Sequence, residues 1–540
     1  MSLLVATACG RTGLQGPAQG GADERGETGS DGPGHSESSA TSSSESSSTG
    51  DTLCDPITGL CPLELRLRRA VDILFVVDNS GSMGGEQGTL VQSFRSFVEV
   101  LESQQVGANY RIGVTTTAAD GQLRATSCRE RLFDFVFEWT FGTIDERQRG
   151  CLDHCIYESI PLPVPWVEKS EGTTNLPAGY DMAAALQCIG PPGINGPGYE
   201  APLESMKLVL EDDGGFLRPD ALLAVIFLTD EADCSASPEQ QGWLQFEGYP
   251  FWTTPDRATS GACWNAGVTC VGGPGVYDDC FAQDKARDGG PSGPEDAVLY
   301  PRERYIDALR ALSLQRQAQG YHGQVLLSLI AGVPLDYPQT HTIEFRDSDL
   351  PDFNIEYGIG PACNFGSETV QDPPGIPDVR MREVVEAFAT DQPNVFSVCS
   401  ADYGVALESI AGAIGEINEK ACVGGCVLDL EPGGALQPSC TLTEQFPPET
   451  GEPDRVVEPC VVTGDGWDFP GPGIGACYRV LDDTSGMTPG TVDDMDAYCV
   501  TSGFNLELVV ERRPEVPVPS GTSIAVHCDL VAEPGIACPP

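Results

Sequence analysis

The feature that most constrains this fold is a short, largely apolar run at residues 71–77, rich in β-branched side chains. Such a run is hydrophobic on both faces, which is typical of a central strand in a parallel sheet that helices cover on both sides. Residues 86–103 follow with apolar side chains at helical spacing. The order strand, tight turn, helix places the connecting loop at the carboxyl end of a parallel strand, where open α/β sheets bind their ligands.

Strand and helix patterns continue to alternate up to residue 420. We expect further strands at 110–117, 221–228, 324–330 and 394–399, and further helices at 201–210, 302–314, 384–389 and 403–417. This alternation predicts an α/β domain with a doubly wound, mostly parallel sheet. Three segments rich in Gly, Pro and Cys, at about 121–170, 232–300 and 332–376, are expected to be disulfide-stapled insertions.

The loop after the first strand contains the pattern Asp-x-Ser-x-Ser, formed by Asp78, Ser80 and Ser82. One carboxylate and two hydroxyls at alternating positions offer hard oxygen ligands, which suit Mg²⁺, Mn²⁺ or Ca²⁺ and suit Zn²⁺ poorly. Because the pattern lies between an apolar strand and an amphipathic helix, we expect it to hold a divalent cation. The alternative is a structural turn without metal.

Residues 73–83 and 221–231 together resemble the von Willebrand factor type A (vWA) domain. The resemblance implies the Rossmann-like vWA fold and a metal-ion-dependent adhesion site (MIDAS). Asp78, Ser80 and Ser82 match its first motif, and Asp230 matches the aspartate that follows a later strand. Glu231 stands where the family usually has glycine, and it adds a negative charge beside the site.

The family also uses a threonine from a second loop, and two positions are open for that role here. Thr174, within residues 172–176, resembles the family's Gly-Gly-Thr-Asn pattern but lies 56 residues before Asp230. Glu200 directly precedes the expected helix at 201–210 and lies 30 residues before Asp230, which fits the topology better, although it is not a threonine. Either an insertion separates Thr174 from the strand, or Glu200 takes the ligand role; of the two we prefer Thr174.

The expected ligand set points to binding rather than to catalysis. A divalent cation held partly by neutral hydroxyls keeps excess positive charge and an open coordination position. A carboxylate of another protein can fill that position and give a directional contact in a small area. The pattern therefore predicts metal-dependent binding of a protein that presents Asp or Glu. The alternative is a structural scaffold of the cell envelope that binds no metal.

The charge balance excludes several classes of partner. The 540 residues include 80 acidic and 30 basic ones, which gives a formal net charge of −50. Binding to nucleic acid, or to an anionic membrane through a basic patch, needs clustered cations and is not expected. No apolar run reaches the roughly 18 residues of a membrane-spanning helix. With five histidines and no common catalytic or nucleotide-binding motif, the chain is not expected to be an enzyme.

The 21 cysteines fall into groups along the chain. Cys9 stands alone, and the other groups hold two, ten and eight cysteines, at 54–61, 128–399 and 422–538. Even numbers in each of these groups indicate disulfides and an oxidising compartment. Paired cysteines also argue against a zinc site at Cys151, His154 and Cys155.

Residues 2–9 form a short apolar run that ends in small residues and Cys9, and it resembles the lipobox of bacterial lipoproteins. The resemblance implies a lipidated Cys9, and Gly10 after it suggests the outer membrane of a Gram-negative bacterium. Residues 10–53 are rich in Gly, Ser and Thr and are expected to form a disordered tether. We therefore predict an exported protein attached to the membrane through a lipid alone. The alternative is a small buried cysteine near the terminus.

Two further segments flank the vWA domain, which we assign to residues 70–420. Residues 54–69 form a lead-in with a cysteine pair. From residue 421 the chain has eight cysteines, many Gly and Pro, and strand-like runs at 456–462 and 506–510. This composition predicts a small, cysteine-rich β module at 421–540, more typical of a spacer or accessory module than of a catalytic domain.

Overall fold

The computed structural model describes residues 54–531 with gaps at 56–57, 69, 104–105, 140–141, 171, 320–323, 365–373, 390–391, 424–426, 429, 431–436, 447–449, 464–465, 483–493, 497–498, 501–503, 505, 514–515, 517 and 520. The predictions for Cys9 and for a tether at 10–53 lie outside the described residues. None of the helices in the described part of the chain combines the length and apolar character needed to span a bilayer.

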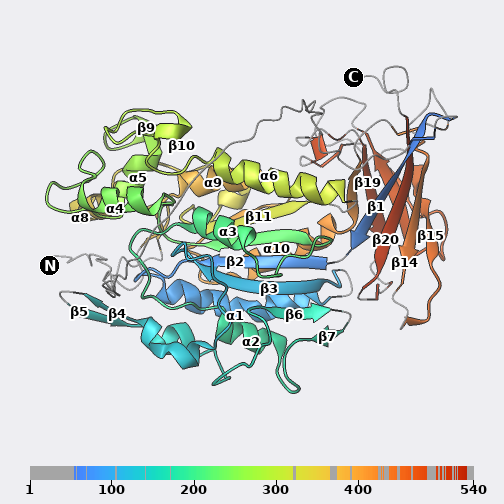
Figure 1. Ribbon diagram of the computed structural model, residues 1–540, viewed down its shortest axis with the longest axis horizontal. Coiled ribbons are helices and arrows are strands. Elements are labelled where there is room, and N and C mark those ends of the chain that lie inside the picture. The colour runs from blue at the N-terminus through green and yellow to red at the C-terminus, as the bar shows by residue number, and fades with distance from the viewer. Residues whose placement is uncertain are drawn as a thin grey trace, which may run out of the picture.

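A seven-stranded sheet in the order β12-β11-β8-β2-β3-β6-β7 forms the centre of the larger part of the molecule (Figure 1). Its strands are β2 (Ala70–Val77), β3 (Asn109–Thr116), β6 (Val167–Ser170), β7 (Thr173–Thr174), β8 (Leu222–Leu228), β11 (Val325–Ala331) and β12 (Val395–Ser397). The five strands from β12 to β3 run parallel, and β6 and β7 add an antiparallel edge. The predicted α/β sheet is thus confirmed.

Helices cover both faces of this sheet. One face packs against α1 (Gly84–Leu101), α2 (Met182–Ile189) and α10 (Gly404–Ile417). The other packs against α3 (Pro202–Glu211), α6 (Glu303–Ala318) and α9 (Val379–Glu386). Along β2, Ile73 and Phe75 belong to the first core, whereas Leu74 and Val76 belong to the second. Because both faces are buried, the strand needs no polar alternation.

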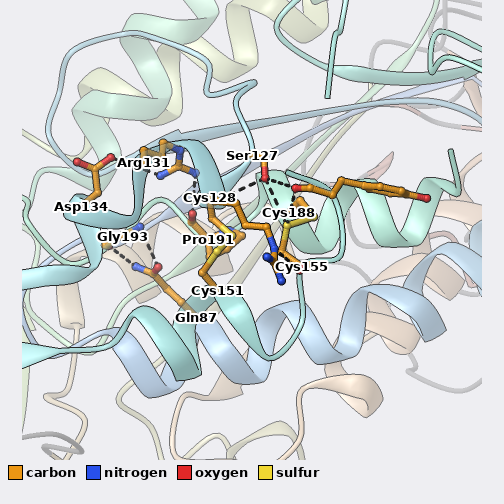
Figure 2. The surroundings of a disulfide bond; sticks show 12 residues. Gln87, Ser127, Cys128, Arg131, Asp134, Cys151, Cys155, Cys188, Pro191 and Gly193 are labelled. Atoms are coloured by element: carbon orange, nitrogen blue, oxygen red, sulfur yellow. Dashed lines mark hydrogen bonds and ion pairs between the residues drawn. A yellow bond between two sulfur atoms is a disulfide. The ribbon is translucent and has the colours of Figure 1, made fainter. Parts of the chain in front are cut away.

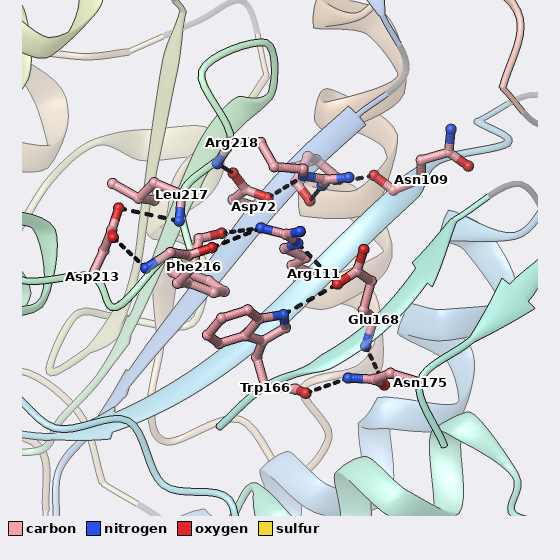
Figure 3. A network of polar contacts seen from close by, with 12 residues as sticks. Asp72, Asn109, Arg111, Trp166, Glu168, Asn175, Asp213, Phe216, Leu217 and Arg218 are labelled. Carbon is pink, nitrogen blue, oxygen red and sulfur yellow. Dashed lines mark hydrogen bonds and ion pairs between the residues drawn. The ribbon is translucent and has the colours of Figure 1, made fainter. Parts of the chain in front are cut away.

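Asp72, the charged residue of β2, is neutralised near the amino ends of the strands (Figure 3). Its carboxylate accepts a hydrogen bond of 2.8 Å from Nε of Arg218, which also donates to the carbonyl oxygens of Val71 and Asn109. Beside this pair, Arg111 of β3 forms an ion pair of 3.0 Å with Glu168 of β6. These contacts satisfy the buried charge and join β2, β3, β6 and the segment before β8.

The three predicted insertions gather at the end of the sheet where β2 finishes (Figure 1). The first contains the helical turns η1 (Cys128–Phe135) and η2 (Gln148–Leu152) and the hairpin of β4 (Val136–Trp139) and β5 (Gly142–Asp145). The second contains α4 (Pro238–Phe246), α5 (Gly261–Gly267), β9 (Val268–Gly272), β10 (Tyr277–Ala282) and η3 (Pro294–Asp296). The third contains α7 (Tyr337–Thr340) and α8 (Pro351–Tyr357).

Nine disulfides lie within the described residues, which confirms the prediction from cysteine spacing. They join Cys54–Cys61, Cys128–Cys151, Cys155–Cys188, Cys234–Cys263, Cys270–Cys280, Cys363–Cys399, Cys422–Cys499, Cys440–Cys528 and Cys460–Cys477. Although the sulfur atoms of Cys128, Cys151 and Cys155 lie close together, all three belong to disulfides (Figure 2). They are therefore not thiolate ligands for zinc. Disulfides in this number indicate an extracytoplasmic protein.

A second seven-stranded sheet occupies the opposite end of the molecule, in the order β1-β20-β14-β15-β18-β19-β13 (Figure 1). Its strands are β1 (Leu60–Arg68), β13 (Lys420–Val423), β14 (Cys440–Gln445), β15 (Arg455–Pro459), β18 (Ala476–Leu481), β19 (Leu506–Arg512) and β20 (Ser523–Val531). A small hairpin of β16 (Val461–Thr463) and β17 (Gly466–Asp468) accompanies them.

The lead-in at 54–69 belongs structurally to this second sheet. Its strand β1 pairs along its whole length with β20, so that Leu65 lies opposite Val526. Leu65 and Leu67 are buried in the same core as Val526 and Leu508. The chain therefore passes through the C-terminal sheet before it enters the parallel sheet, which the sequence does not indicate.

Candidate metal centre

The Asp-x-Ser-x-Ser loop begins where β2 ends and is shaped by its own first residue. The carboxylate of Asp78 accepts a hydrogen bond of 2.8 Å from the backbone N–H of Ser80, which turns the chain toward α1. Gln87, on the first turns of α1, donates to the carbonyl oxygen of Asp78 at 2.8 Å. It also donates to the carbonyl oxygen of Gly193 at 2.7 Å (Figure 2). The loop is thus fixed both by its own turn and by the segment that precedes α3.

Parallel pairing brings the end of β8 to the same place. Val77 pairs with Leu228, so the residues that follow the two strands meet at one edge of the sheet. Thr229 donates a hydrogen bond of 2.6 Å to Oδ2 of Asp78. Ser82 Oγ donates to Oδ1 of Asp230 at 3.2 Å, and the hydroxyls of Ser80 and Ser82 lie 3.0 Å apart. The structure therefore brings together the four residues that match the vWA motifs.

Glu200 joins this group from the loop before α3. Thr117, which directly follows β3, donates its hydroxyl hydrogen to Oε2 of Glu200, and Oδ1 of Asn79 lies 3.4 Å from the same hydroxyl oxygen. The backbone N–H of Ala201 donates to the carbonyl oxygen of Thr117 at 2.8 Å, which anchors the loop. The charged neighbours of the Glu200 carboxyl group are Asp78, Glu231 and Asp230, so the side chain belongs to the same cluster.

Thr174 lies far from this group. It belongs to β7 at the edge of the sheet, where it pairs with Lys169, and Lys169 in turn pairs with Tyr110 near the amino end of β3. Asp78 follows the opposite, carboxyl end of β2. Thr174 is also exposed, and its hydroxyl accepts a hydrogen bond of 3.0 Å from the backbone N–H of Leu176. The preference for Thr174 as the second-loop ligand is therefore corrected, because of the two alternatives only Glu200 lies in the cluster.

Four carboxyl groups share this buried space. Asp78, Glu200 and Asp230 are at most 2% exposed, and Glu231 is 8% exposed. Burial raises the pKa of all four, and neighbouring carboxylates raise those of Glu200, Asp230 and Glu231 further. For Asp230, burial and then the charge of Asp78 raise the pKa to about 8. Among the described residues, no lysine or arginine forms an ion pair with any of the four.

The donor set fits a hard divalent cation. Oε1 of Glu200 is buried and has no hydrogen-bond partner among the described residues. Burial of an ionised carboxylate without a partner is costly, so the group must be protonated or bound to a cation. Carboxylate oxygens from Asp78, Glu200 and Asp230, together with the hydroxyls of Ser80 and Ser82, are the ligands that Mg²⁺, Mn²⁺ and Ca²⁺ prefer.

All three insertions contact the cluster. From the first, the ring of Phe137 covers Gly81, where a Cβ would lie 3.2 Å from the ring. From the second, the backbone N–H of Cys234 donates to the carbonyl oxygen of Glu200 at 2.7 Å. From the third, the N–H of Ile376 donates to the carbonyl oxygen of Asp230 at 2.9 Å. Of the five candidate ligands, Ser82 alone is partly exposed.

Two residues of the site were not predicted, Thr117 and Thr229. Each directly follows a strand that lies next to β2 in the sheet. The predicted parallel strands did contain a signal, because residues that follow neighbouring parallel strands meet at one edge of the sheet. The sequence alone does not show which of these hydroxyls bonds to which carboxylate.

Comparisons with known proteins leave the family open. No protein-family model and no curated protein sequence matches the chain. Among solved structures, the pilus adhesin RrgA from Streptococcus pneumoniae is similar over 89% of this chain and 60% of that chain, with 10% sequence identity and a TM-score of 0.23. This chain thus covers less than two thirds of that adhesin. A similarity of this size carries no inference about function.

Proposed function

We propose that this protein is an exported binding protein whose vWA-like domain holds a divalent cation and binds a partner protein only when the cation is present. Asp78, Ser80, Ser82, Asp230 and Glu200 would hold Mg²⁺, Mn²⁺ or Ca²⁺. The observation that carries this proposal is the burial of several carboxyl groups around two serine hydroxyls without a basic side chain to neutralise them. The cation would supply that neutralising charge and a directional contact for the partner.

The partner in this proposal is a protein that brings an Asp or Glu side chain to the cation. The partly exposed Ser82 and Asn79 mark the side from which such a group would approach. The net charge of −50 opposes an acidic partner at long range, so added salt should speed association by screening this repulsion.

Attachment to the outer membrane through a lipid on Cys9 belongs to the same proposal. It is supported by the resemblance of residues 2–9 to a lipobox and by the extracytoplasmic character that the disulfides indicate. Cys9→Ser in the full precursor should move the protein from the membrane fraction to the soluble fraction. Retention of this variant in the membrane fraction would contradict the lipid anchor.

Titration of the chelator-treated full chain with Mn²⁺, followed by calorimetry, tests cation binding. The wild type should bind Mn²⁺. Removal of a side chain that only hydrogen-bonds to a metal ligand lowers metal affinity about 10- to 100-fold. Ser82→Ala removes a proposed ligand itself. We therefore expect it to lower Mn²⁺ affinity by at least as much. Ser96→Ala is the matched control, because Ser96 lies on α1 and donates to the carbonyl oxygen of Ser93. A wild-type chain that binds no Mn²⁺ would defeat the proposal.

The enclosure of the cluster favours a second candidate function, a metal-free envelope scaffold. Asp78, Glu200 and Asp230 are almost completely buried. If these groups were protonated instead of metal-bound, they could stay buried without a cation. The same titration separates the candidates, since a scaffold of this kind would bind no divalent cation at any concentration near neutral pH.

A further inference from the structure

Glu200 is an unusual member of the cluster because one of its oxygens is unused. Oε2 accepts the hydrogen bond from Thr117, whereas Oε1 is buried without a partner. The charged neighbours of its carboxyl group are Asp78, Glu231 and Asp230. A buried oxygen without a partner is a candidate ligand for a cation at this cluster.

The backbone holds Glu200 in this place from two sides. Its carbonyl oxygen accepts a hydrogen bond from Cys234, in the second insertion, and the next residue, Ala201, donates to Thr117 at the end of β3. Cys234 is in turn fixed by its disulfide to Cys263. The loop therefore holds its carboxylate toward the cluster instead of toward solvent.

The charge of Glu200 changes what the site can accept. A divalent cation is already neutralised by the two carboxylates of Asp78 and Asp230. When all four carboxyl groups of the cluster are ionised, Glu200 and Glu231 bring the local charge to −2 before any partner arrives. An incoming acid group would bring it to −3 inside a buried space, where such repulsion is large. Glu200 thus supplies, from this chain itself, a carboxylate like the one that a partner protein would bring.

We propose that Glu200 is an internal competitor for the partner's carboxylate. It occupies the position at the cation that an Asp or Glu of the partner would take, and its side chain must turn away before that partner binds. This inference rests on the proposed function, since it requires that Asp78, Ser80, Ser82 and Asp230 hold a cation. It makes Glu200 a specificity-determining residue that keeps weak or small acids out of the site.

Acetate is the probe for this proposal, used on the full chain loaded with Mn²⁺. Binding of ¹³C-labelled acetate to the ion is followed through the ¹³C–Mn²⁺ coupling in pulsed electron paramagnetic resonance. The variants are Glu200→Thr, which restores a neutral hydroxyl at this position, and Glu200→Gln, which keeps the shape and removes the charge. Glu239→Thr is the control, because Glu239 lies exposed in the same insertion that contacts Glu200.

Both Glu200 variants should bind acetate at least about tenfold more tightly than the wild type, because one buried negative charge is removed. Loss of one of the five candidate ligands should weaken Mn²⁺ binding, so acetate is added at a Mn²⁺ concentration that saturates each variant. Glu239→Thr should match the wild type in both measurements. Equal acetate binding by the wild type and both variants would overturn the inference and leave the proposed function intact. Bound Mn²⁺ without acetate in every variant would also overturn it. Absence of Mn²⁺ binding by the wild type would overturn both.

Discussion

At the scale of single residues, the site is organised by hydroxyl groups that orient carboxylates. Thr229 donates to one oxygen of Asp78, the backbone of Ser80 donates to the other, and Thr117 donates to Glu200. A buried carboxylate that accepts such bonds is held in one orientation and resists protonation. These threonines therefore position the ligands without being required as ligands themselves.

Thr229→Val should weaken both cation binding and the folded state. The substitution keeps the shape of the side chain but removes the hydrogen bond of 2.6 Å to Asp78. We expect a loss of about 1–3 kcal/mol in unfolding free energy, because a buried carboxylate loses its donor. Mn²⁺ affinity should fall about tenfold or more. Calorimetric titration and urea unfolding measure the two effects.

Thr174→Val is the matched control for this substitution. Thr174 is exposed at the far edge of the sheet, so the change should leave Mn²⁺ affinity unchanged. If Thr174→Val lost Mn²⁺ binding and Thr229→Val did not, the second-loop ligand would be Thr174 instead of Glu200.

Metal removal should make the stability of the domain depend on pH. Without a cation, burial raises the pKa of Asp230 to about 8, above the value of about 3.9 for an unfolded Asp. The folded state therefore binds a proton that the unfolded state releases, and stability falls as the pH rises from about 4 to 8. The slope for one such group approaches about 1.4 kcal/mol per pH unit. Urea unfolding in EDTA from pH 5 to 8 measures it.

In saturating Mn²⁺ the unfolding free energy should depend much less on pH, because the cation replaces the proton at Asp230. The Glu200 and Glu231 carboxyl groups, whose pKa values are also raised by burial and by neighbouring carboxylates, act in the same direction. A stability profile that is identical in EDTA and in Mn²⁺ would show that no cation binds at this cluster.

At the scale of elements, the sequence was most informative where strands are buried on both faces. The predicted strands at 71–77, 221–228 and 324–330 match β2, β8 and β11 almost residue for residue. Their continuous apolar character requires a parallel sheet covered by helices. Parallel pairing then explains why Asp78 and Asp230 meet, and that part of the site was predictable.

The antiparallel edge was not predictable in the same way. Strands β6 and β7 are four and two residues long, and they lie within or just after an insertion. Short strands with both polar and apolar residues show no clear hydrophobic periodicity, and their register depends on contacts with β3. Without that register, Thr174 and Glu200 could not be distinguished by pattern alone, since both follow plausible loops.

The Cys234–Cys263 disulfide should support the metal centre from the second insertion. Cys234 donates to the backbone of Glu200, and the disulfide closes a loop with a sequence separation of 29. Its removal by Cys234→Ser with Cys263→Ser should cost about 3 kcal/mol of stability. Mn²⁺ affinity should also fall, because the Glu200 loop loses this support. Thermal unfolding and Mn²⁺ titration measure both.

The Cys270–Cys280 disulfide offers a control within the same insertion. It joins β9 to β10, in which Cys270 and Cys280 are paired residues, across a separation of only 10 residues. Its double serine variant should lose less stability and bind Mn²⁺ like the wild type. Equal losses of Mn²⁺ affinity in both double variants would indicate a general loosening of the insertion instead of a specific contact with Glu200.

At the scale of the whole molecule, the candidate metal centre and the C-terminal sheet lie at opposite ends of the parallel sheet (Figure 1). Strand β1 runs directly into β2, so the C-terminal sheet adjoins the amino ends of the parallel strands. The pairing of β1 with β20 joins the two ends of the described chain. Sequence patterns specify strands but not partners hundreds of residues apart, so this arrangement could not be predicted.

Leu67→Ala should therefore destabilise the C-terminal sheet without changing the metal centre. Leu67 is 3% exposed and belongs to the core formed with Leu508 and Val526. Truncation of a buried leucine to alanine costs about 2–5 kcal/mol. Proteolysis under native conditions should cut the variant faster within 421–531, and Mn²⁺ affinity should match the wild type. Arg66→Ala, on the exposed face of β1, should change neither. If Leu67→Ala also abolished Mn²⁺ binding, the two ends would be coupled through β1 and β2, and the C-terminal sheet would have to be counted as part of the binding machinery.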